Sequence, residues 1–248
     1  MVADNQVLDR QFWEWVGVPM VRVMSYNIRS LRDDSVAVVR VIRAADPDVV
    51  CVQEAPRFLF WRRKCARLAR DVGMTNASGG RIAAANLLLT KPGITVDASR
   101  SVLFSKDRGL HQRGVALAVL RIGEAIVVLA GTHLDGYPEP RLRHVRELFT
   151  AIDAFAPAAT PVVFAGDFND DPGTAVWNAL SSRGADAFAA AGIGDGLTLN
   201  VTDPTRRIDA IFAGRGITVT GAHAISSDDV RAASDHRPVL ADLHIHAR

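Results

Sequence analysis

The sequence predicts an α+β fold in which β-sheets pack together and helices lie on the outside, as one domain. Strand-like and helix-like segments are mixed along the 248 residues without strict β-α-β alternation. Two apolar segments, Val115–Arg121 and Ala125–Ala130, flank Gly123-Glu124, which is typical of an antiparallel hairpin. With 48% hydrophobic residues, the chain can fill a substantial core.

The first third of the chain alternates short apolar strands with helices. Asp34 or Ser35 can act as an N-cap, and Gly73 can end a helix. The elements predicted in order are strand Val21–Ser25, helix Ser35–Ala45, strand Asp48–Gln53, helix Phe58–Val72 and strand Asn86–Thr90.

The remainder continues after the hairpin with both kinds of element. An amphipathic, Arg-rich periodicity predicts one long helix, and Gly184 lies just beyond a shorter one. The predicted elements are helix Pro140–Phe155, strand Val162–Ala165, helix Thr174–Ser182, and strands Ile208–Ala213, Ile217–Ala224 and Pro238–Ile245.

Composition and charge narrow the class of protein. The net charge of +2 indicates no strong electrostatic attraction to nucleic acid, and no apolar run approaches the ~18 residues of a membrane span. Residues 1–19 contain no signal-peptide core and are predicted as an N-terminal extension to a single domain, residues 20–248. Cys51 and Cys65 form no CxxC motif or disulfide framework. We therefore expect a cytoplasmic monomer without a transmembrane segment.

Polar residues follow the apolar run Val162–Ala165 without a break. The strand leads into Gly-Asp-Phe-Asn-Asp-Asp, so that carboxylate and amide groups lie at its end. An ordinary turn explains these residues, because Asp, Asn and Gly all favour turns. A metal or phosphate site also explains them, because a carboxylate beside an apolar strand is costly without a partner.

Five other segments place polar residues at a strand terminus or inside a strand. Each has an ordinary explanation as a turn, a cap or an exposed edge, but Asp209 interrupts an apolar run and needs a partner. If the strand ends share one edge, they form a pocket rich in carboxylate, amide and imidazole groups, which suits Mg²⁺ or Mn²⁺. These residues are Asn27, Gln53-Glu54, His133, Asp209 and Asp235-His236.

Other phosphate-handling motifs fit less well. The segment VVFAGD resembles a Walker B strand, but none of the three lysines follows a glycine, so no Walker A loop is present. Gly166-Asp167-Phe168-Asn169-Asp170 fits the GDxxD box of calcineurin-like metallophosphoesterases, whose early D-x-H and GNH boxes are missing. No G-x-S-x-G nucleophile elbow occurs.

The order of the motifs YN, QE, THL, GDFN, IDAIF and SDHRP is similar to that of the endonuclease/exonuclease/phosphatase superfamily, which has a deoxyribonuclease-I-like fold. The resemblance spans Val21 to Ile245. It implies a four-layered α/β/β/α sandwich of two mostly antiparallel sheets flanked by helices. It also implies hydrolysis of a phosphoester with Mg²⁺ or Mn²⁺, the substrate class extending from nucleic acids to phospholipid headgroups and small phosphoesters.

The resemblance assigns roles on the metal side of the site. Glu54 corresponds to the main metal ligand, and Asp235 to a second carboxylate on that side. Asn27 corresponds to a residue that supports the metal or the phosphate, and His133 to a hydrogen-bond donor to phosphate.

The resemblance also assigns roles beside the attacking water. Asp167 and Asn169 correspond to the pair that orients or deprotonates water and holds phosphate. His236 corresponds to an imidazole beside the scissile phosphate, oriented by Asp209 as a triad acid orients its histidine. This pairing accounts for an acid inside an apolar strand.

Three features depart from or add to the family pattern. Arg29 stands where nuclease branches often have an acidic or amide residue, which disfavours an abasic-site endonuclease. The basic and aromatic segment Arg57–Lys64 fits either an ordinary amphipathic helix or a stacking rim for nucleic acid. Arg113 is a weaker candidate for a phosphate contact.

The alternative function is a non-catalytic module that binds phosphate or nucleic acid. Such a module would have lost a core residue of the site, and all of the core site residues are present in this sequence.

Overall fold

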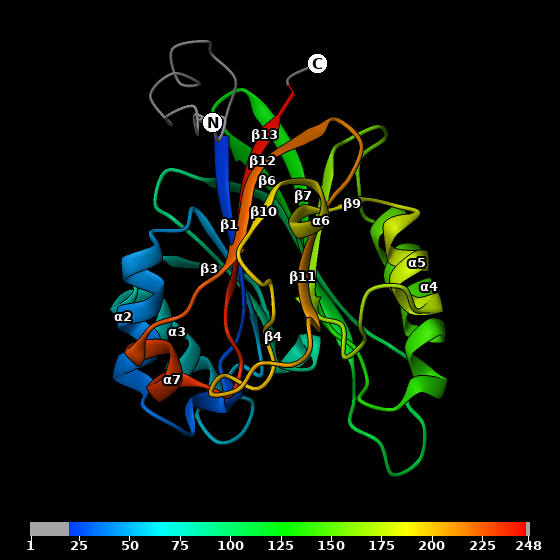
Figure 1. Ribbon diagram of the computed structural model, residues 1–248. Helices are drawn as coiled ribbons and strands as arrows, with labels where there is room; N and C mark the ends of the chain where they lie inside the picture. The colour runs from blue at the N-terminus through cyan, green and yellow to red at the C-terminus, as the bar shows by residue number, and fades with distance from the viewer. Residues whose placement is uncertain (1–19, 247–248) are drawn as a thin grey trace, which may run out of the picture.

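The structure, a computed structural model, describes residues 20–246 as two β-sheets packed face to face with helices on both outer surfaces (Figure 1). The predicted extension, residues 1–19, lies outside the described residues. The strand orders are β10-β12-β13-β1-β2-β4-β3 in the seven-stranded sheet and β5-β6-β7-β8-β11-β9 in the six-stranded sheet. Both sheets are mixed, with most pairs antiparallel, which confirms the predicted four-layered sandwich.

The strands of the seven-stranded sheet come from both ends of the chain. β1 lies at its centre, antiparallel to β13 and parallel to β2. The strands are β1 (Met20–Asn27), β2 (Val49–Gln53), β3 (Thr75–Gly80), β4 (Asn86–Thr90), β10 (Gly192–Ile193), β12 (Ile217–Ala224) and β13 (Val239–Ile245).

The six-stranded sheet is built mainly from the middle of the chain. The predicted hairpin is present as β6 and β7, and β7 then pairs parallel with β8. The strands are β5 (Thr95–Leu103), β6 (Gly114–Ile122), β7 (Ala125–His133), β8 (Val162–Asp167), β9 (Ala185–Asp186) and β11 (Asp209–Ala213).

Helices cover the two outer faces separately. In Figure 1, α2, α3 and α7 cover the seven-stranded sheet, and α4 and α5 cover the six-stranded sheet. No helix among residues 20–246 has both the length and the apolar character that crossing a bilayer requires. The helices are α2 (Ser35–Ala45), α3 (Trp61–Asp71), α4 (Pro138–Asp153), α5 (Ala175–Ser181), α6 (Ala187–Ala191) and α7 (Asp228–Ala233), with 3₁₀ turns η1 (Arg29–Leu31) and η2 (Arg81–Ala83).

The buried apolar residues form three clusters that correspond to the interfaces between layers. Val23, Leu88 and Ile211 belong to the cluster between the two sheets. A second cluster lies under α2 and α3, and a third under α4 and α5, where the rings of Phe164 and Phe212 stack at 5.0 Å between centroids. Since successive side chains of a strand point to opposite faces, each sheet packs against the other sheet on one face and against helices on the other.

The start of α3 differs from the prediction. The helix begins at Trp61 rather than Phe58, because Phe60 has a left-handed backbone (φ 58°) that ends helical geometry on its N-terminal side. The buried face of α3 consists of Cys65, Leu68 and Ala69. The apolar residues before Trp61 therefore do not contribute to an amphipathic helix, and their side chains are exposed.

Candidate active site

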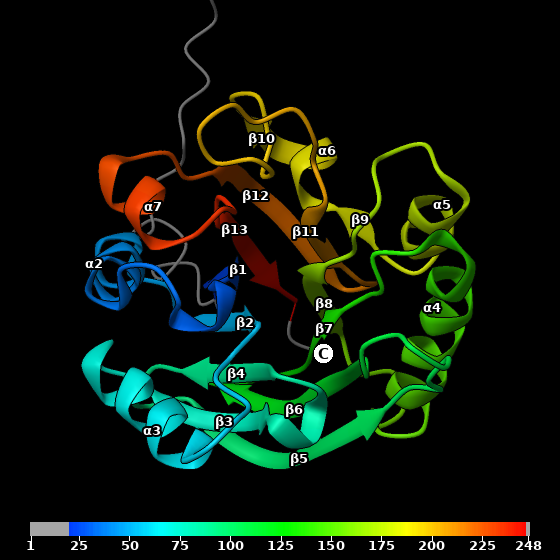
Figure 2. The same cartoon turned by 90° about the horizontal axis from the view of Figure 1, so that it is seen from below.

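Strand pairing brings the predicted polar residues to one end of the sandwich, seen from below in Figure 2. The parallel pairing of β1 and β2 sets Asn27 opposite Gln53, directly before Glu54. In the other sheet, β7 and β8 set His133 opposite Asp167, and the antiparallel pairing of β8 and β11 sets Asp209 opposite Asp167. The site therefore lies where both sheets end.

Asp167, which is 1% exposed, forms the centre of this group. Its Oδ2 accepts a hydrogen bond from Asn27 Nδ2 at 3.0 Å, which joins the two sheets. Its Oδ1 accepts from the backbone N–H of Asn169 at 3.0 Å. The predicted turn interpretation is thus partly correct, because the carboxylate does cap its own turn, but the second oxygen serves the opposite sheet.

Asn169 lies in the left-handed region (φ 53°), which asparagine tolerates better than most residues. Its Nδ2 donates to Leu134 O at 3.0 Å and lies 3.0 Å from His133 Nε2. Since Nδ2 is a donor, His133 Nε2 is the acceptor and the neutral ring carries its proton on Nδ1. The amide is thereby held in one orientation beside Asp167.

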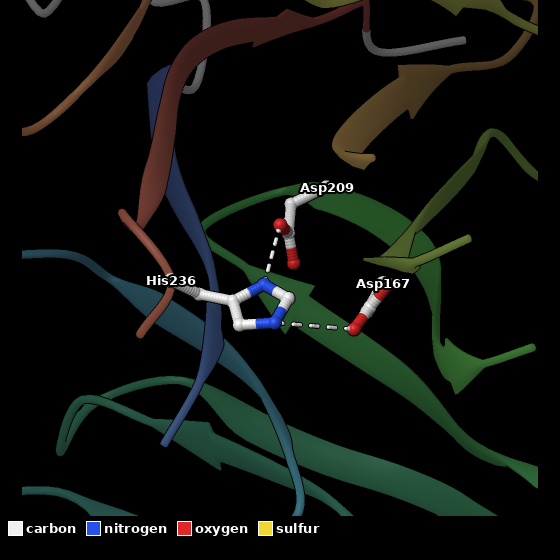
Figure 3. A group of neighbouring side chains, drawn as sticks. All are labelled: Asp167, Asp209 and His236. Atoms are coloured by element: carbon white, nitrogen blue, oxygen red, sulfur yellow. Dashed lines mark hydrogen bonds and ion pairs between the residues drawn. The ribbon is translucent and has the colours of Figure 1, made fainter. Parts of the chain in front are cut away.

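His236 and Asp209 form the predicted pair (Figure 3). Asp209 Oδ2 lies 2.8 Å from His236 Nδ1, and the other imidazole nitrogen, Nε2, lies 3.8 Å from Asp167 Oδ2. Both side chains are nearly inaccessible to solvent, at 1% and 6% exposure. The acid inside the apolar β11 therefore has the partner that the sequence pattern required, and this partner is the imidazole that the family resemblance implied.

The two histidines of the site, His133 and His236, differ in charge. Burial lowers the pKa of His133 to about 3, in spite of Asp167, which lies 3.3 Å from its Nε2. Burial also lowers the pKa of His236, but the charge and the hydrogen bond of Asp209 oppose this effect. With added contributions from Asp167 and Asp235, the pKa of His236 is raised to about 10. At neutral pH, His133 is neutral and His236 is an imidazolium.

Glu54 and Asp235 lie near one cationic group, although no direct contact joins them among the described residues. Arg29 Nε lies 3.4 Å from Asp235 Oδ2, and its Nη1 donates to Asp33. The pKa of Arg29 is raised first by Asp235, then by Asp33, and also by the charge of Glu54. The negative charges of Glu54 and Asp235, the two carboxylates predicted to bind metal, therefore both stabilise the charged form of Arg29, which lies just after β1.

The donor set fits a hard divalent cation. Glu54, Asp235 and the Asn27 amide oxygen are oxygen donors of the kind that Mg²⁺ and Mn²⁺ prefer. Ligand atoms of Asp167, Asp209 and His236 also lie within 4.8 Å of one another. In that second group, His236 Nδ1 and Asp209 Oδ2 lie 2.8 Å apart, so both atoms already take part in a hydrogen bond, and a proton network accounts for the group better than metal ligation.

Two supporting contacts were not predicted from the sequence. Arg141 on α4 donates from Nη1 to Asn169 O at 2.5 Å, and its Nε lies 3.3 Å from Asp170 Oδ2. Thr198 Oγ1 accepts the backbone N–H groups of both Ile208 and Asp209 at 3.2 Å. Neither residue has a local signature, since Arg141 is one of several arginines on its helix and Thr198 lies in an irregular segment. Arg113 is partly buried with its Nε 3.7 Å from Asp135 Oδ2, and its contact with phosphate stays a prediction.

The fold, the site and the sequence agree on the family. The model of the endonuclease/exonuclease/phosphatase family matches residues 24–236, and the chain belongs to this family. No curated protein matches the sequence.

Solved structures share the fold at low identity. A family protein from Bacteroides thetaiotaomicron superposes with a TM-score of 0.79 at 17% identity, covering 92% of this chain and 98% of that one. The mannosyl-6-phosphatase of the same organism gives 0.76 at 17% identity, with 90% and 99% covered. D. rerio TDP2 in complex with a single-strand DNA product gives 0.69 at 18% identity, with 90% and 98% covered.

Proposed function

We propose that this chain is a divalent-metal-dependent phosphoester hydrolase in which water attacks phosphorus in line with the leaving oxygen. The observation that carries the proposal is the buried Asp167 carboxylate, in contact with Asn27 from the other sheet and close to the charged His236. A carboxylate, an oriented amide and an imidazolium at one point are the groups needed to activate water and to stabilise phosphoryl charge. Family membership supports the same reaction class.

We assign the attacking water to Asp167 and Asn169. Asp167 has one oxygen bonded within its own turn and one facing the groups of the site, so it can accept a proton from water. The Asn169 amide is fixed by Leu134 O and His133 Nε2, which gives it a defined direction without a change on binding. Since its Nε2 is occupied, His133 acts mainly as a positioning residue for Asn169, and any hydrogen bond that it donates comes from Nδ1.

We assign the phosphoryl oxygens to His236. Its Nδ1 is held by Asp209, so the protonated Nε2 remains to donate to the phosphate in the interior of the site. The imidazolium stabilises the charge that develops as the water attacks, and Asp209 keeps the ring charged and oriented. A buried donor of this kind needs no reorientation during the reaction.

Glu54, Asn27 and Asp235 would hold Mg²⁺ or Mn²⁺. When bound, the cation supplies polarisation of a phosphoryl oxygen and neutralisation of its charge. Arg29, which pairs with Asp235, adds positive charge on the same side.

A hydrolysis panel tests the proposal. The protein is incubated with phosphomonoesters, phosphodiesters, nucleic acids and phospholipids in the presence of Mg²⁺, Mn²⁺ or EDTA. The variants Asp167→Asn and Asp153→Asn are assayed in the same way. Asp153→Asn is the control, because the Asp153 carboxylate is on the surface of α4 and pairs with Arg183. We expect hydrolysis of at least one class that EDTA abolishes and Asp167→Asn reduces, while Asp153→Asn behaves as wild type. Turnover that persists in EDTA or in Asp167→Asn would contradict the mechanism, and failure on every class would contradict the function.

A further inference from the structure

Three consecutive large apolar side chains are exposed in the turn before α3. Phe58, Leu59 and Phe60 are 67%, 73% and 61% exposed. Single exposed apolar residues are ordinary on protein surfaces, but a contiguous group marks an interaction site. Phe60 has a left-handed backbone (φ 58°), which is unfavourable for a bulky residue and persists only where the surrounding structure supports it.

Two further exposed apolar residues extend this group along the same edge of the molecule. Ile82 on η2 is 55% exposed and Leu103 at the end of β5 is 53% exposed. η2 packs against β5, and α3 packs against β3, which leads directly into η2 (Figure 2). We name the five residues the apolar rim: Phe58, Leu59, Phe60, Ile82 and Leu103.

The turn is anchored to the sheet beneath it. Gly80, the last residue of β3, has φ +84°, and a Cβ there would lie 2.4 Å from the Trp61 ring. The glycine therefore allows the indole to pack directly against the strand end. The turn that carries Phe58, Leu59 and Phe60 is therefore fixed to β3 through the contact between Trp61 and Gly80.

The surroundings of the apolar rim are strongly basic. Between residues 55 and 70 the chain has no acidic residue. Burial of Cys65, Leu68 and Ala69 leaves the charged side of α3 exposed. None of the basic side chains in this stretch other than Arg67 has a carboxylate partner among the described residues. The basic residues are Arg57, Arg62, Arg63, Lys64, Arg67 and Arg70.

The apolar rim adjoins the candidate active site. Arg57 lies three residues after Glu54 in the sequence. On the other side, Leu103 pairs with Gly114 in the β5–β6 register, and Gly114 pairs with His133 in the β6–β7 register. A surface that contacts the apolar rim is therefore next to the end of the sandwich at which the candidate site lies.

We propose that the apolar rim and the basic face of α3 dock the protein on the surface of an anionic phospholipid bilayer. Exposed apolar side chains beside a basic amphipathic helix are the combination that binds such a surface, since the side chains enter the interface and the charges meet anionic headgroups. Docking brings the site to the phosphoesters of the headgroups; that these are the substrate rests on the proposed function.

A single-stranded nucleic acid fits these observations less well. Bases stack on aromatic rings, but Leu59, Ile82 and Leu103 are aliphatic. An arginine also lies over one face of each ring, where a base would have to compete with it: Arg57 is 5.3 Å from the Phe58 centroid and Arg63 is 5.6 Å from that of Phe60.

Vesicle flotation tests the docking without any need for turnover. Wild type and the impaired Asp167→Asn are mixed with vesicles of phosphatidylcholine, alone or with phosphatidylserine. We expect both proteins to bind the mixed vesicles equally and the neutral ones more weakly. Phe58→Ser with Leu59→Ser should lower the partition coefficient about tenfold or more, since each side chain leaves an apolar environment. Arg62→Glu with Arg63→Glu should lower it by at least about fivefold for each charge.

Matched controls come from other parts of the surface. Ile193→Ser removes an apolar side chain that is 67% exposed on β10, at the opposite edge of the seven-stranded sheet. Arg146→Glu with Arg215→Glu reverses two exposed charges outside α3. Both controls should bind vesicles as wild type does, and circular dichroism should show all variants folded.

Three results would overturn the docking: wild type that does not float with anionic vesicles, controls that lose binding as much as the apolar-rim variants, or variants that lose binding to a single-stranded oligonucleotide but not to vesicles. Protein that floats as expected but hydrolyses no ester would instead leave the docking intact and contradict the proposed function. The two proposals therefore fail separately.

Discussion

Replacing Asp209 by Asn should discharge His236 at neutral and mildly alkaline pH. Asn keeps the shape and can still accept a hydrogen bond from Nδ1, but it removes the charge 2.8 Å from the ring. Burial, the largest influence on the imidazole, then acts against only Asp167 and Asp235. The pKa of His236 should therefore fall from about 10 to its ordinary value of 6.5 or lower.

The size of this change sets the expected loss of activity. At pH 8, a group with a pKa of 10 is charged in about 99% of molecules, whereas one with a pKa of 6.5 is charged in only about 3%. If the imidazolium is the active form, kcat/KM at pH 8 should fall about 30-fold from this cause alone. The alkaline limb of the rate profile should move from near pH 10 to pH 6.5 or below.

The same shift predicts how stability depends on pH. Because the folded-state pKa of His236 is raised, the pair contributes stability that is fully present below about pH 6.5 and is lost as pH rises toward 10. The difference in unfolding free energy between wild type and Asp209→Asn should therefore shrink across this range. Urea titrations at several pH values measure it.

Two assays check the reasoning independently. NMR titration of metal-free protein gives the pKa directly, with the His236 signal assigned by its loss in His236→Ala. A double-mutant cycle on kcat/KM should be strongly non-additive, since the two residues act as one unit. A limb that stays in place in Asp209→Asn, or losses that add, would show that Asp209 stabilises β11 rather than the charge on the histidine.

The remaining predictions concern the metal, the water and the strand beneath them. Glu54→Gln should abolish or strongly weaken Mg²⁺ binding in calorimetry, and unchanged affinity would remove Glu54 from the ligand set. Asp167→Asn and Asn169→Ala should each lower kcat by on the order of 10²-fold with little change in melting temperature; near-normal turnover would return these residues to a turn role. Gly166→Ala should destabilise the fold by at least about 3 kcal/mol, since its Cβ would lie 2.0 Å from a backbone oxygen of β7, whereas Gly136→Ala, with open space around it, should melt as wild type does.

Most of the fold followed from local sequence patterns. The strands β2, β6, β7 and β8 were evident as apolar runs, because both faces of each strand are buried and nearly every residue is therefore apolar. β3 and β5 were not predicted, since β3 has the sequence TNASGG and β5 is polar and largely exposed along its length. Such strands form because a neighbouring strand offers hydrogen bonds, not because their own residues favour it.

The site was predictable to a different degree at each residue. The need of Asp209 for a partner followed from its position in an apolar run, but the identity of that partner came from the family resemblance. The exposure of Phe58 could not be foreseen, because apolar spacing before Trp61 fits a helix unless the left-handed backbone at Phe60 is known. Arg29 was noted only as a departure, and its pairing with Asp235 depends on strands far apart in the sequence.

Asp167 lies between two histidines whose environments differ in one decisive respect. His133 and His236 are both buried, and both place Nε2 within 4 Å of the same Asp167 oxygen, at 3.3 and 3.8 Å. Only His236 has a second carboxylate, Asp209, on its other nitrogen, and this difference separates pKa values of about 3 and about 10. The His133 ring can then accept a hydrogen bond from the Asn169 amide, while the His236 ring donates one to phosphate. A single aspartate in β11 thus allows two chemically identical side chains to take opposite roles around one carboxylate.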